Sequence, residues 1–305
     1  MPKPIESKPA AFRTISALRD FGYDFNVAVG DIVDNSLSPQ LNTSEIIILY
    51  DKNFFEKQFF VRILDDGKGM NDAELLEAMR YGAGSGVYKK GDLSKFGMGL
   101  KTASLSQCNR LTVISRSETD GLINGYIWDV EHVKETNHWE VLKLNDSEIS
   151  VILTGEDERY YPHYKKTLRE ILDKRKSWTL VMWDDLESID RNFSAYKLEK
   201  FARNYFDKTV ANLTLYLRMT FQRFLDGTAD RGKVSISFNG ELLEPWDPFC
   251  RNEPNTVHDK MKDEDSDFSM SADGLKINPV IINRYILPSK DGAYGFSSEQ
   301  AWRDA

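Results

Sequence analysis

Hydrophobic spacing along the first 185 residues switches repeatedly between helical and strand-like patterns. Apolar residues from Phe12 to Val33 recur at helical intervals, and Gly22 with Tyr23 predicts a break that divides the helix 12–40 in two. Short apolar runs bounded by turn residues predict strands. The expected strands are 45–50, 59–64, 110–115, 125–129, 139–143, 150–153 and 179–183. The other expected helices are 72–81 (capped by Asn71), 100–106, 161–174 and 195–225.

A second block with a different pattern begins near Lys233. VSISFNG predicts a strand that ends in an Asn-Gly hairpin turn, and KINPVIINRYIL predicts another strand. The acidic, polar stretch 255–275 between them predicts a surface loop. The sequence ends at SSEQAWRDA with no recognisable closing element, so we expect the natural protein to be longer.

Amino-acid composition and charge limit the classes of protein to which this chain can belong. The 305 residues carry 40 Lys+Arg against 48 Asp+Glu, and a net charge of -8 argues against nonspecific DNA binding by the chain as a whole. Apolar runs are too short to span a membrane, and the start lacks an apolar signal region. Two distant cysteines and four scattered histidines show no zinc spacing. These features together predict a cytoplasmic globular protein.

Three short motifs are candidates for chemistry. DIVDN places Asp31 and Asn35 four residues apart on one helix face, where a carboxylate can polarise a water and an amide oxygen can bind Mg²⁺. DDGKGM follows a strand, so the carboxylate of Asp65 can accept a hydrogen bond from an exocyclic amine beside a glycine turn. Read alone, the first motif is more typical of a solvated polar stripe, and the second of a turn before a helix.

The third motif, GMGLKT at 97–102, opens a predicted helix. Free backbone amides at a helix start attract phosphate, and Lys101 adds positive charge. The motif is neither a P-loop nor a dinucleotide fingerprint, because GxxxxGK[ST] and GxGxxG do not occur. The stretch 82–96 before it is glycine-rich and polar, which predicts a loop.

The order and spacing of the three motifs resemble the Bergerat ATP-binding fold of the GHKL superfamily, over roughly residues 12–185. The resemblance implies an α+β fold, a mixed sheet covered by helices, followed by a transducer-like (ribosomal S5-like) domain. It implies an ATP-binding domain at 1–226 and a transducer-like domain at 227–305, incomplete at its C-terminus. It also implies ATP and Mg²⁺ as ligands and an ATP-dependent homodimer.

The resemblance also assigns roles to single residues. Asp31 would be the general base, Asn35 would hold Mg²⁺, and Asp65 would bind adenine, while the loop 82–96 would close over ATP as a lid. The remaining nucleotide contacts would come from Gly67, Gly69, Met70, Gly82, Lys95, Phe96, Gly97, Met98, Gly99, Leu100, Lys101, Thr102 and Thr179.

One residue departs from the family pattern. The base is normally Glu, and Asp31 is one methylene shorter, which implies poor reach to the water and slow turnover. Asp34 is a rival base, although relatives use that position to support the site from behind. A nucleotide-gated binding module with negligible turnover therefore remains an alternative to an ATPase.

Two segments point to a branch of the superfamily. LRDFGYDFNVAVGDIVDNSL and VSISFNGELLEPWDPF resemble MORC and MutL proteins, including bacterial MORC-type relatives associated with restriction and phage defence. This implies DNA or a DNA-processing protein as a partner, and Lys290 as one candidate for the lysine that a transducer domain supplies to the γ-phosphate. A chaperone is a further alternative. A histidine kinase is disfavoured because no histidine precedes Asn35.

Overall fold

The computed structural model describes residues 9–19, 23–53, 58–81, 99–154, 172–186, 199–251, 253–260, 271–272, 275–276, 283–289, 296–298 and 302. The chain divides into two compact units, Met1–Glu244 and Pro245–Ala305. None of the described helices combines the length and apolar character that a membrane crossing requires.

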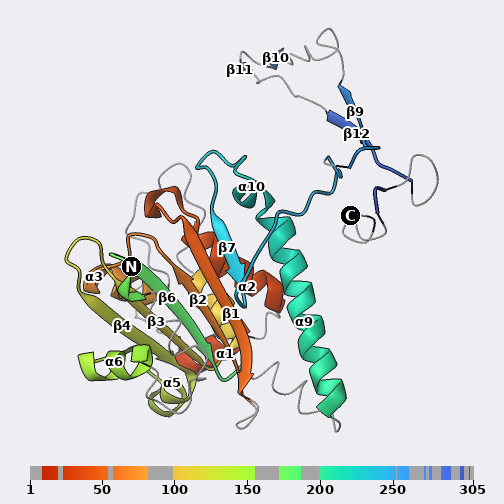
Figure 1. The fold of residues 1–305 in the computed structure, drawn as a ribbon. Coiled ribbons are helices and arrows are strands. Elements are labelled where there is room, and N and C mark those ends of the chain that lie inside the picture. The colour runs from red at the N-terminus through yellow and green to blue at the C-terminus, as the bar shows by residue number, and fades with distance from the viewer. Residues whose placement is uncertain are drawn as a thin grey trace. The chain divides into compact units, whose positions relative to one another are not determined.

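The first unit is built on an eight-stranded mixed sheet (Figure 1). Its strands are β1 (Glu45–Asn53), β2 (Gln58–Asp65), β3 (Arg110–Arg116), β4 (Ile123–Asp129), β5 (Leu142–Lys143), β6 (Trp178–Asp184), β7 (Ser235–Phe238) and β8 (Glu241–Leu242). Their order is β5-β4-β3-β6-β2-β1-β7-β8. All neighbouring pairs are antiparallel except β1 and β7. The long central strands read as near-continuous apolar runs because both faces of the sheet are covered.

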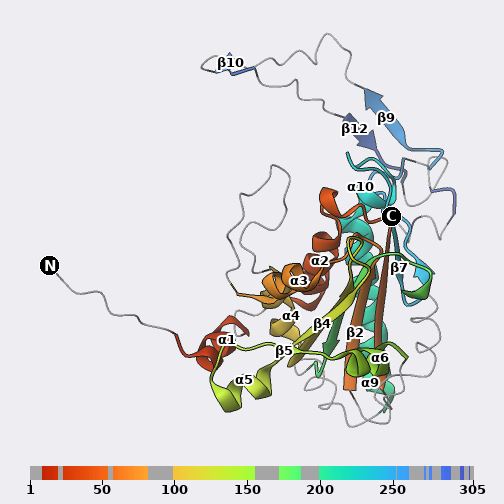
Figure 2. The same ribbon diagram turned by 90° about the vertical axis from the view of Figure 1, so that its left-hand side faces the viewer.

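Most helices gather on one face of this sheet, and Figure 2 shows α1 to α4 together on one side of it. The helices of the first unit are α1 (Ala11–Arg19), α2 (Phe25–Ser36), α3 (Asp72–Met79), α4 (Gly99–Gln107), α5 (Val130–Thr136), α6 (Asp146–Thr154), α9 (Glu199–Thr220) and α10 (Gln222–Leu225), with a 3-10 turn at Pro39–Leu41. A smaller apolar cluster, to which α6 contributes, covers the other face. The expected mixed α/β sandwich is confirmed.

Local capping explains where the two helices nearest the motifs begin. Asp24 caps α2 by accepting hydrogen bonds from the backbone amides of Asn26 and Val27. Asn71 and Glu74 form a reciprocal capping box at the start of α3. The predicted break near Gly22 and Tyr23 is confirmed, since α1 ends at Arg19 and α2 starts at Phe25.

One expected strand is a helix. Residues 150–153 lie inside α6, and the amide of Glu148 bonds the Asn145 side chain while the Glu148 carboxylate accepts from the Asn145 amide. This second capping box starts a helix whose apolar run is too short to be distinguished from a strand by periodicity. The strand expected at 139–143 shrinks to β5, Leu142–Lys143. The helix expected at 161–174 lies largely outside the described residues.

The two compact units meet at 244/245, and the boundary between an ATP-binding and a transducer-like domain at 226/227 stays a prediction. The predicted hairpin is present as β7 and β8, joined by Asn239 and Gly240 at positive φ. However, β7 pairs in parallel with β1, so the hairpin belongs to the main sheet and the first unit extends to Glu244. In the second unit, β9 (Val257–Lys260) pairs with β12 (Asn283–Ile286), and β10 (Ser271–Ala272) pairs with β11 (Leu275–Lys276). Strands β9 and β10 lie within the stretch 255–275, which was expected to be a loop, and 261–270 lie outside the described residues.

Candidate functional site

A buried carboxylate lies at the end of the central strand β2. Asp65 is only 6% exposed, and it accepts hydrogen bonds from Ser36 Oγ at 3.0 Å and from the Gly67 backbone amide at 3.0 Å. Burial raises the pKa of Asp65 to about 6, although these two hydrogen bonds act in the opposite direction. A carboxylate offers about four lone-pair positions, so Asp65 can accept further donors.

The turn after Asp65 requires its glycines for packing within the protein. Gly69 has a φ of +63°, and a Cβ there would lie 1.9 Å from the Arg116 carbonyl oxygen. At Gly67 a Cβ would lie 2.8 Å from Asp65 Oδ1. Both glycines therefore let this turn pack closely against strand β3 and the Asp65 side chain.

A hydroxyl pair joins three elements beside Asp65. Thr179 on β6 is the strand partner of Asp65, so the two side chains lie next to each other on one face of the sheet. Ser115 on β3 lies 3.0 Å from the Thr179 hydroxyl and accepts a hydrogen bond from the Met70 backbone amide at 2.9 Å. Ser115 also donates to the Trp178 carbonyl. These bonds hold the 65–70 turn against β3 and β6.

Helix α2 presents the other predicted polar residues. Asp31 and Asn35 are both half-buried and lie four residues apart on one helix. Tyr23 donates its hydroxyl to Asp31 Oδ2 at 2.8 Å, and this hydrogen bond is the largest of the causes that raise the pKa of Tyr23. Asp34 is half-buried as well, and its pKa is raised first by burial and then by the charge of Asp31. The hydroxyl of Tyr23 thus fixes the orientation of the Asp31 carboxylate.

The motif suggests that Lys101 on α4 faces a phosphate, but the structure places its side chain in another contact. Its side chain is 2% exposed, and Nζ donates to the Ala78 carbonyl at the end of α3, at 2.9 Å. Burial lowers the pKa of Lys101 to about 8, although Glu77 opposes this shift. Lys101 therefore ties α3 to α4, and its ammonium would have to leave this carbonyl to contact a phosphate.

The start of α4 keeps two features that suit an anionic ligand. A Cβ at Gly99 would meet nothing within 4 Å among the described residues, and the buried Thr102 hydroxyl has no hydrogen-bond partner among them either. Leu100 is half-buried beside them. Five predicted site residues fall outside the described residues, together with the predicted lid 82–96: Gly82, Lys95, Phe96, Gly97 and Met98.

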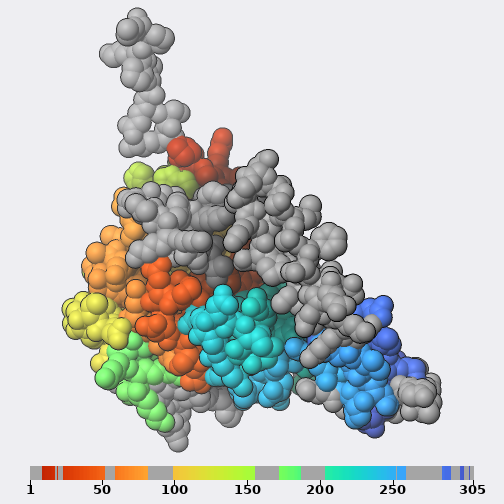
Figure 3. Space-filling model, turned by 90° about the horizontal axis from the view of Figure 1, so that it is seen from above, coloured from red at the N-terminus to blue at the C-terminus, as the bar shows by residue number. Residues whose placement is uncertain are grey.

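The loop between α2 and β1 is fixed from a distant part of the chain. Arg231 donates to the backbone carbonyls of Leu37 and Ser38 and, at 2.8 Å, to that of Thr43. Figure 3 shows the cyan region around 221–232 against the orange region that contains this loop. Asp66 secures the other end of the loop by accepting from the Ser44 and Glu45 amides. Hydrogen bonds therefore hold the loop beside Asp65 in place at both of its ends.

Sequence reasoning missed three residues that position the site. Ser36 follows Ile32 by one helical turn, so a serine on the buried face of α2 was the available signal. Ser115 is a serine within the buried part of strand β3, which is a signal of the same kind. Nothing in the sequence indicated a role for Tyr23 in the site, because its contact with Asp31 depends on the turn between α1 and α2.

Comparison with known proteins adds one family match. No curated protein matches the chain. The model described as "Histidine kinase-, DNA gyrase B-, and HSP90-like ATPase" matches residues 23–158, a segment that contains Asp31, Asn35, Asp65 and Lys101 but not Thr179. The mixed sheet with helices on its faces is consistent with the Bergerat fold of these ATPases. Residues 23–158 are therefore similar to the ATPase domain of the GHKL family, which suggests that this part of the chain binds and hydrolyses ATP.

Proposed function

We propose that the first unit binds Mg-ATP, with Asp65 reading the adenine ring, and hydrolyses it slowly. The observation that carries this proposal is the buried Asp65 carboxylate at the end of β2, oriented by Ser36 and Gly67 within the segment that matches the ATPase family. An oriented, ionised acceptor in a mostly dry site selects a partner that donates, such as the exocyclic amine of adenine.

The chemistry of the described residues fits a nucleotide. Asp65 keeps acceptor capacity for an amine, and Thr179 lies beside it to support that contact. Among the described residues, the Thr102 hydroxyl has no hydrogen-bond partner and nothing fills the space beside Gly99, and both features fit a phosphate at the start of α4. Gly67 and Gly69 shape the turn that follows Asp65.

Few protein ligands are available for the metal. The described residues contain no cluster of three or more His, Cys, Asp or Glu side chains that could hold an ion. Asn35 supplies one amide oxygen, and Mg²⁺ normally completes its six ligands with waters and substrate phosphates. Bound there, Mg²⁺ would neutralise charge on the phosphates, while Asn35 would hold its position.

The proposed reaction is attack of water on the γ-phosphate. Asp31 would accept a proton from that water, and Tyr23 would hold the carboxylate in one orientation. Catalysis of this kind depends mainly on positioning and charge neutralisation. The short Asp31 side chain, with one oxygen already bonded to Tyr23, also supports a second candidate function: a nucleotide-gated binding module with negligible turnover.

The proposal extends to a biological setting. ATP would gate dimerisation and a conformational change, with DNA or a DNA-processing protein as partner, in DNA-related or phage-defence processes. The support is the resemblance of the 18–37 segment and of VSISFNGELLEPWDPF to MORC and MutL proteins, which would make the region after the ATP-binding domain transducer-like. Lys290, the candidate transducer lysine, lies outside the described residues. Stimulation of hydrolysis by DNA would favour this setting, and stimulation by an unfolded client would favour a chaperone.

A phosphate-release assay with Mg-ATP tests the proposed reaction. The protein should release phosphate at a slow rate that Asp31→Asn abolishes, whereas Asp34→Asn should retain measurable turnover. If the unmodified chain binds ATP but releases no more phosphate than Asp31→Asn, the binding module replaces the ATPase. If Asp34→Asn alone abolishes turnover, Asp34 is the base.

A further inference from the structure

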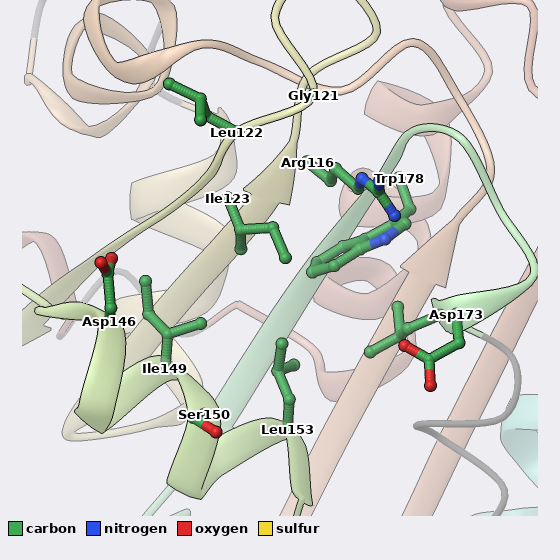
Figure 4. Close-up of a pocket in the computed structure, with 11 residues that line it drawn as sticks. Arg116, Gly121, Leu122, Ile123, Asp146, Ile149, Ser150, Leu153, Asp173 and Trp178 are labelled. Atoms are coloured by element: carbon green, nitrogen blue, oxygen red, sulfur yellow. The ribbon is translucent and has the colours of Figure 1, made fainter.

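A pocket lies on the sheet face opposite the candidate nucleotide site (Figure 4). It occupies about 350 Å³, within the range of small-molecule sites. Strands β3, β4 and β6 form its floor, and α6 forms one wall. The 121–122 turn lies at one end of the pocket.

Strand geometry separates this pocket from the candidate nucleotide site. Ser115 pairs with Thr179 on one face of the sheet, and the next pair along the strands is Arg116 with Trp178. Successive side chains of a strand point to opposite faces, so Arg116 and Trp178 turn into the pocket side by side. The two sites therefore share strands without sharing side chains.

The pocket combines apolar walls with donors that lack acceptors. Its walls include Ile149 and Leu153 from α6. The Trp178 side chain is 1% exposed, and neither its Nε1 nor the buried Nε of Arg116 has a hydrogen-bond partner within the described structure. Arg116 Nη1 reaches the Arg175 carbonyl only at 3.4 Å. Two neighbouring donors without acceptors are costly in a folded protein unless something else satisfies them.

We propose that this pocket binds a small molecule with an apolar body and an oxygen acceptor at one end. A carboxylate or carbonyl oxygen would accept from Arg116 and, after a small shift of the guanidinium, from Trp178 Nε1. The aliphatic walls would cover the apolar body. Asp146 and Asp173 also line the pocket, and their charge disfavours further negative groups along the ligand. The inference is independent of the proposed ATP chemistry.

Three eight-carbon probes test the required head group on the whole chain. Octanoate and octanamide both carry an oxygen acceptor on an apolar tail, whereas octylamine carries a cationic donor at neutral pH. Ligand-observed NMR titration should show saturable binding of octanoate and octanamide, with octylamine at least tenfold weaker. Equal binding of octylamine would overturn the head-group assignment, and absence of binding by all three would overturn the site.

Matched variants locate the binding. Leu122→Trp fills the pocket from a position that is 62% exposed, and Leu242→Trp makes the same change on β8 at a residue that is 61% exposed. The first should abolish octanoate binding and the second should leave it unchanged. Equal effects of the two variants would place the binding elsewhere.

A second pair tests the indole donor. Trp178 and Trp183 are both fully buried with Nε1 unpartnered within the described structure, but Trp183 packs in the core on the other face of the sheet. Trp178→Phe should weaken octanoate binding about tenfold, as expected for a lost bond to a charged group, while Trp183→Phe should not. Unchanged affinity in folded Trp178→Phe would remove the indole from the site. If Trp178→Phe does not fold, octanoate binding by Leu122→Trp and Leu242→Trp tests the proposal.

Discussion

The hydroxyl of Ser36, the last residue of α2, donates to Asp65 Oδ2, the last residue of β2, at 3.0 Å. This bond joins the helix that carries Asp31 and Asn35 to the carboxylate proposed to read adenine. The proposed metal-binding and adenine-reading parts of the site are therefore connected through one buried contact. It also fixes which Asp65 lone pairs remain available to a ligand.

Replacing Ser36 by Ala should weaken adenosine binding. Loss of the hydroxyl frees the Asp65 carboxylate to rotate and removes a bond that favours its ionised form, so affinity at neutral pH should fall about three- to tenfold. Calorimetric titration with adenosine measures this. Ser16→Ala is the control, because the Ser16 hydroxyl bonds the Phe12 carbonyl within its own helix α1. Equal affinities of Ser36→Ala and the parent would show that the contact does not orient Asp65.

The raised pKa of Asp65, about 6, gives adenosine binding a defined pH dependence. The amine of adenine needs an ionised acceptor, and burial favours the protonated form, so affinity should rise as the pH increases through 6 and level off above 7. One pH unit below the pKa only about a tenth of the carboxyl is ionised, which predicts about tenfold weaker binding at pH 5. Adenosine avoids the titration of phosphate groups. A flat profile between pH 5 and 7 would contradict the assigned acceptor.

Tyr23 should act on turnover rather than on nucleotide affinity. Its hydroxyl holds Asp31 at 2.8 Å, so Tyr23→Phe leaves the proposed base free to rotate away from the attacking water. We expect kcat for ATP hydrolysis to fall about five- to tenfold with KM nearly unchanged. Tyr126→Phe removes a similar bond, to Asp72 at 2.9 Å, and should leave kcat unaltered. A change in KM alone would assign Tyr23 to nucleotide binding.

Gly69 should tolerate no side chain. Gly69→Ala adds a Cβ that meets the Arg116 carbonyl oxygen at 1.9 Å, so β3 and the 65–70 turn must separate. The free energy of unfolding in urea should fall by more than about 3 kcal/mol. Gly121→Ala is matched in backbone angle, with a φ of +69°, but its Cβ meets nothing within 4 Å, so about 1 kcal/mol of backbone strain is expected. Similar losses in both variants would show that φ alone limits Gly69.

Local patterns predicted the elements around the site well. The capped helices α2 and α3 and the apolar strand β2 each carry their start or end signals within a few residues, which is why Asp31, Asn35 and Asp65 lie where the motifs place them. The strand expected at 150–153 was wrong because its three consecutive apolar residues, 151–153, fit either period. Its capping box at 145–148 was the better guide.

Features that depend on distant partners were beyond local reasoning. The pairing of β7 with β1 moves the hairpin into the main sheet, and no pattern within VSISFNG indicates its partner strand. The Ala78 carbonyl that binds Lys101 belongs to a different helix, so a lysine after a glycine motif looked available to phosphate. Ser36 likewise shows its role only beside Asp65.

The most direct test of the central claim is calorimetric titration of Mg-ATP and Mg-GTP into the unmodified chain and into Asp65→Asn. Guanine presents a carbonyl oxygen where adenine presents an amine, so a fixed carboxylate should favour ATP by at least tenfold. Asp65→Asn should lose at least tenfold in ATP affinity and most of this preference, whereas Asp120→Asn, an exposed charge loss, should lose neither. Unchanged ATP affinity in a folded Asp65→Asn would contradict the account.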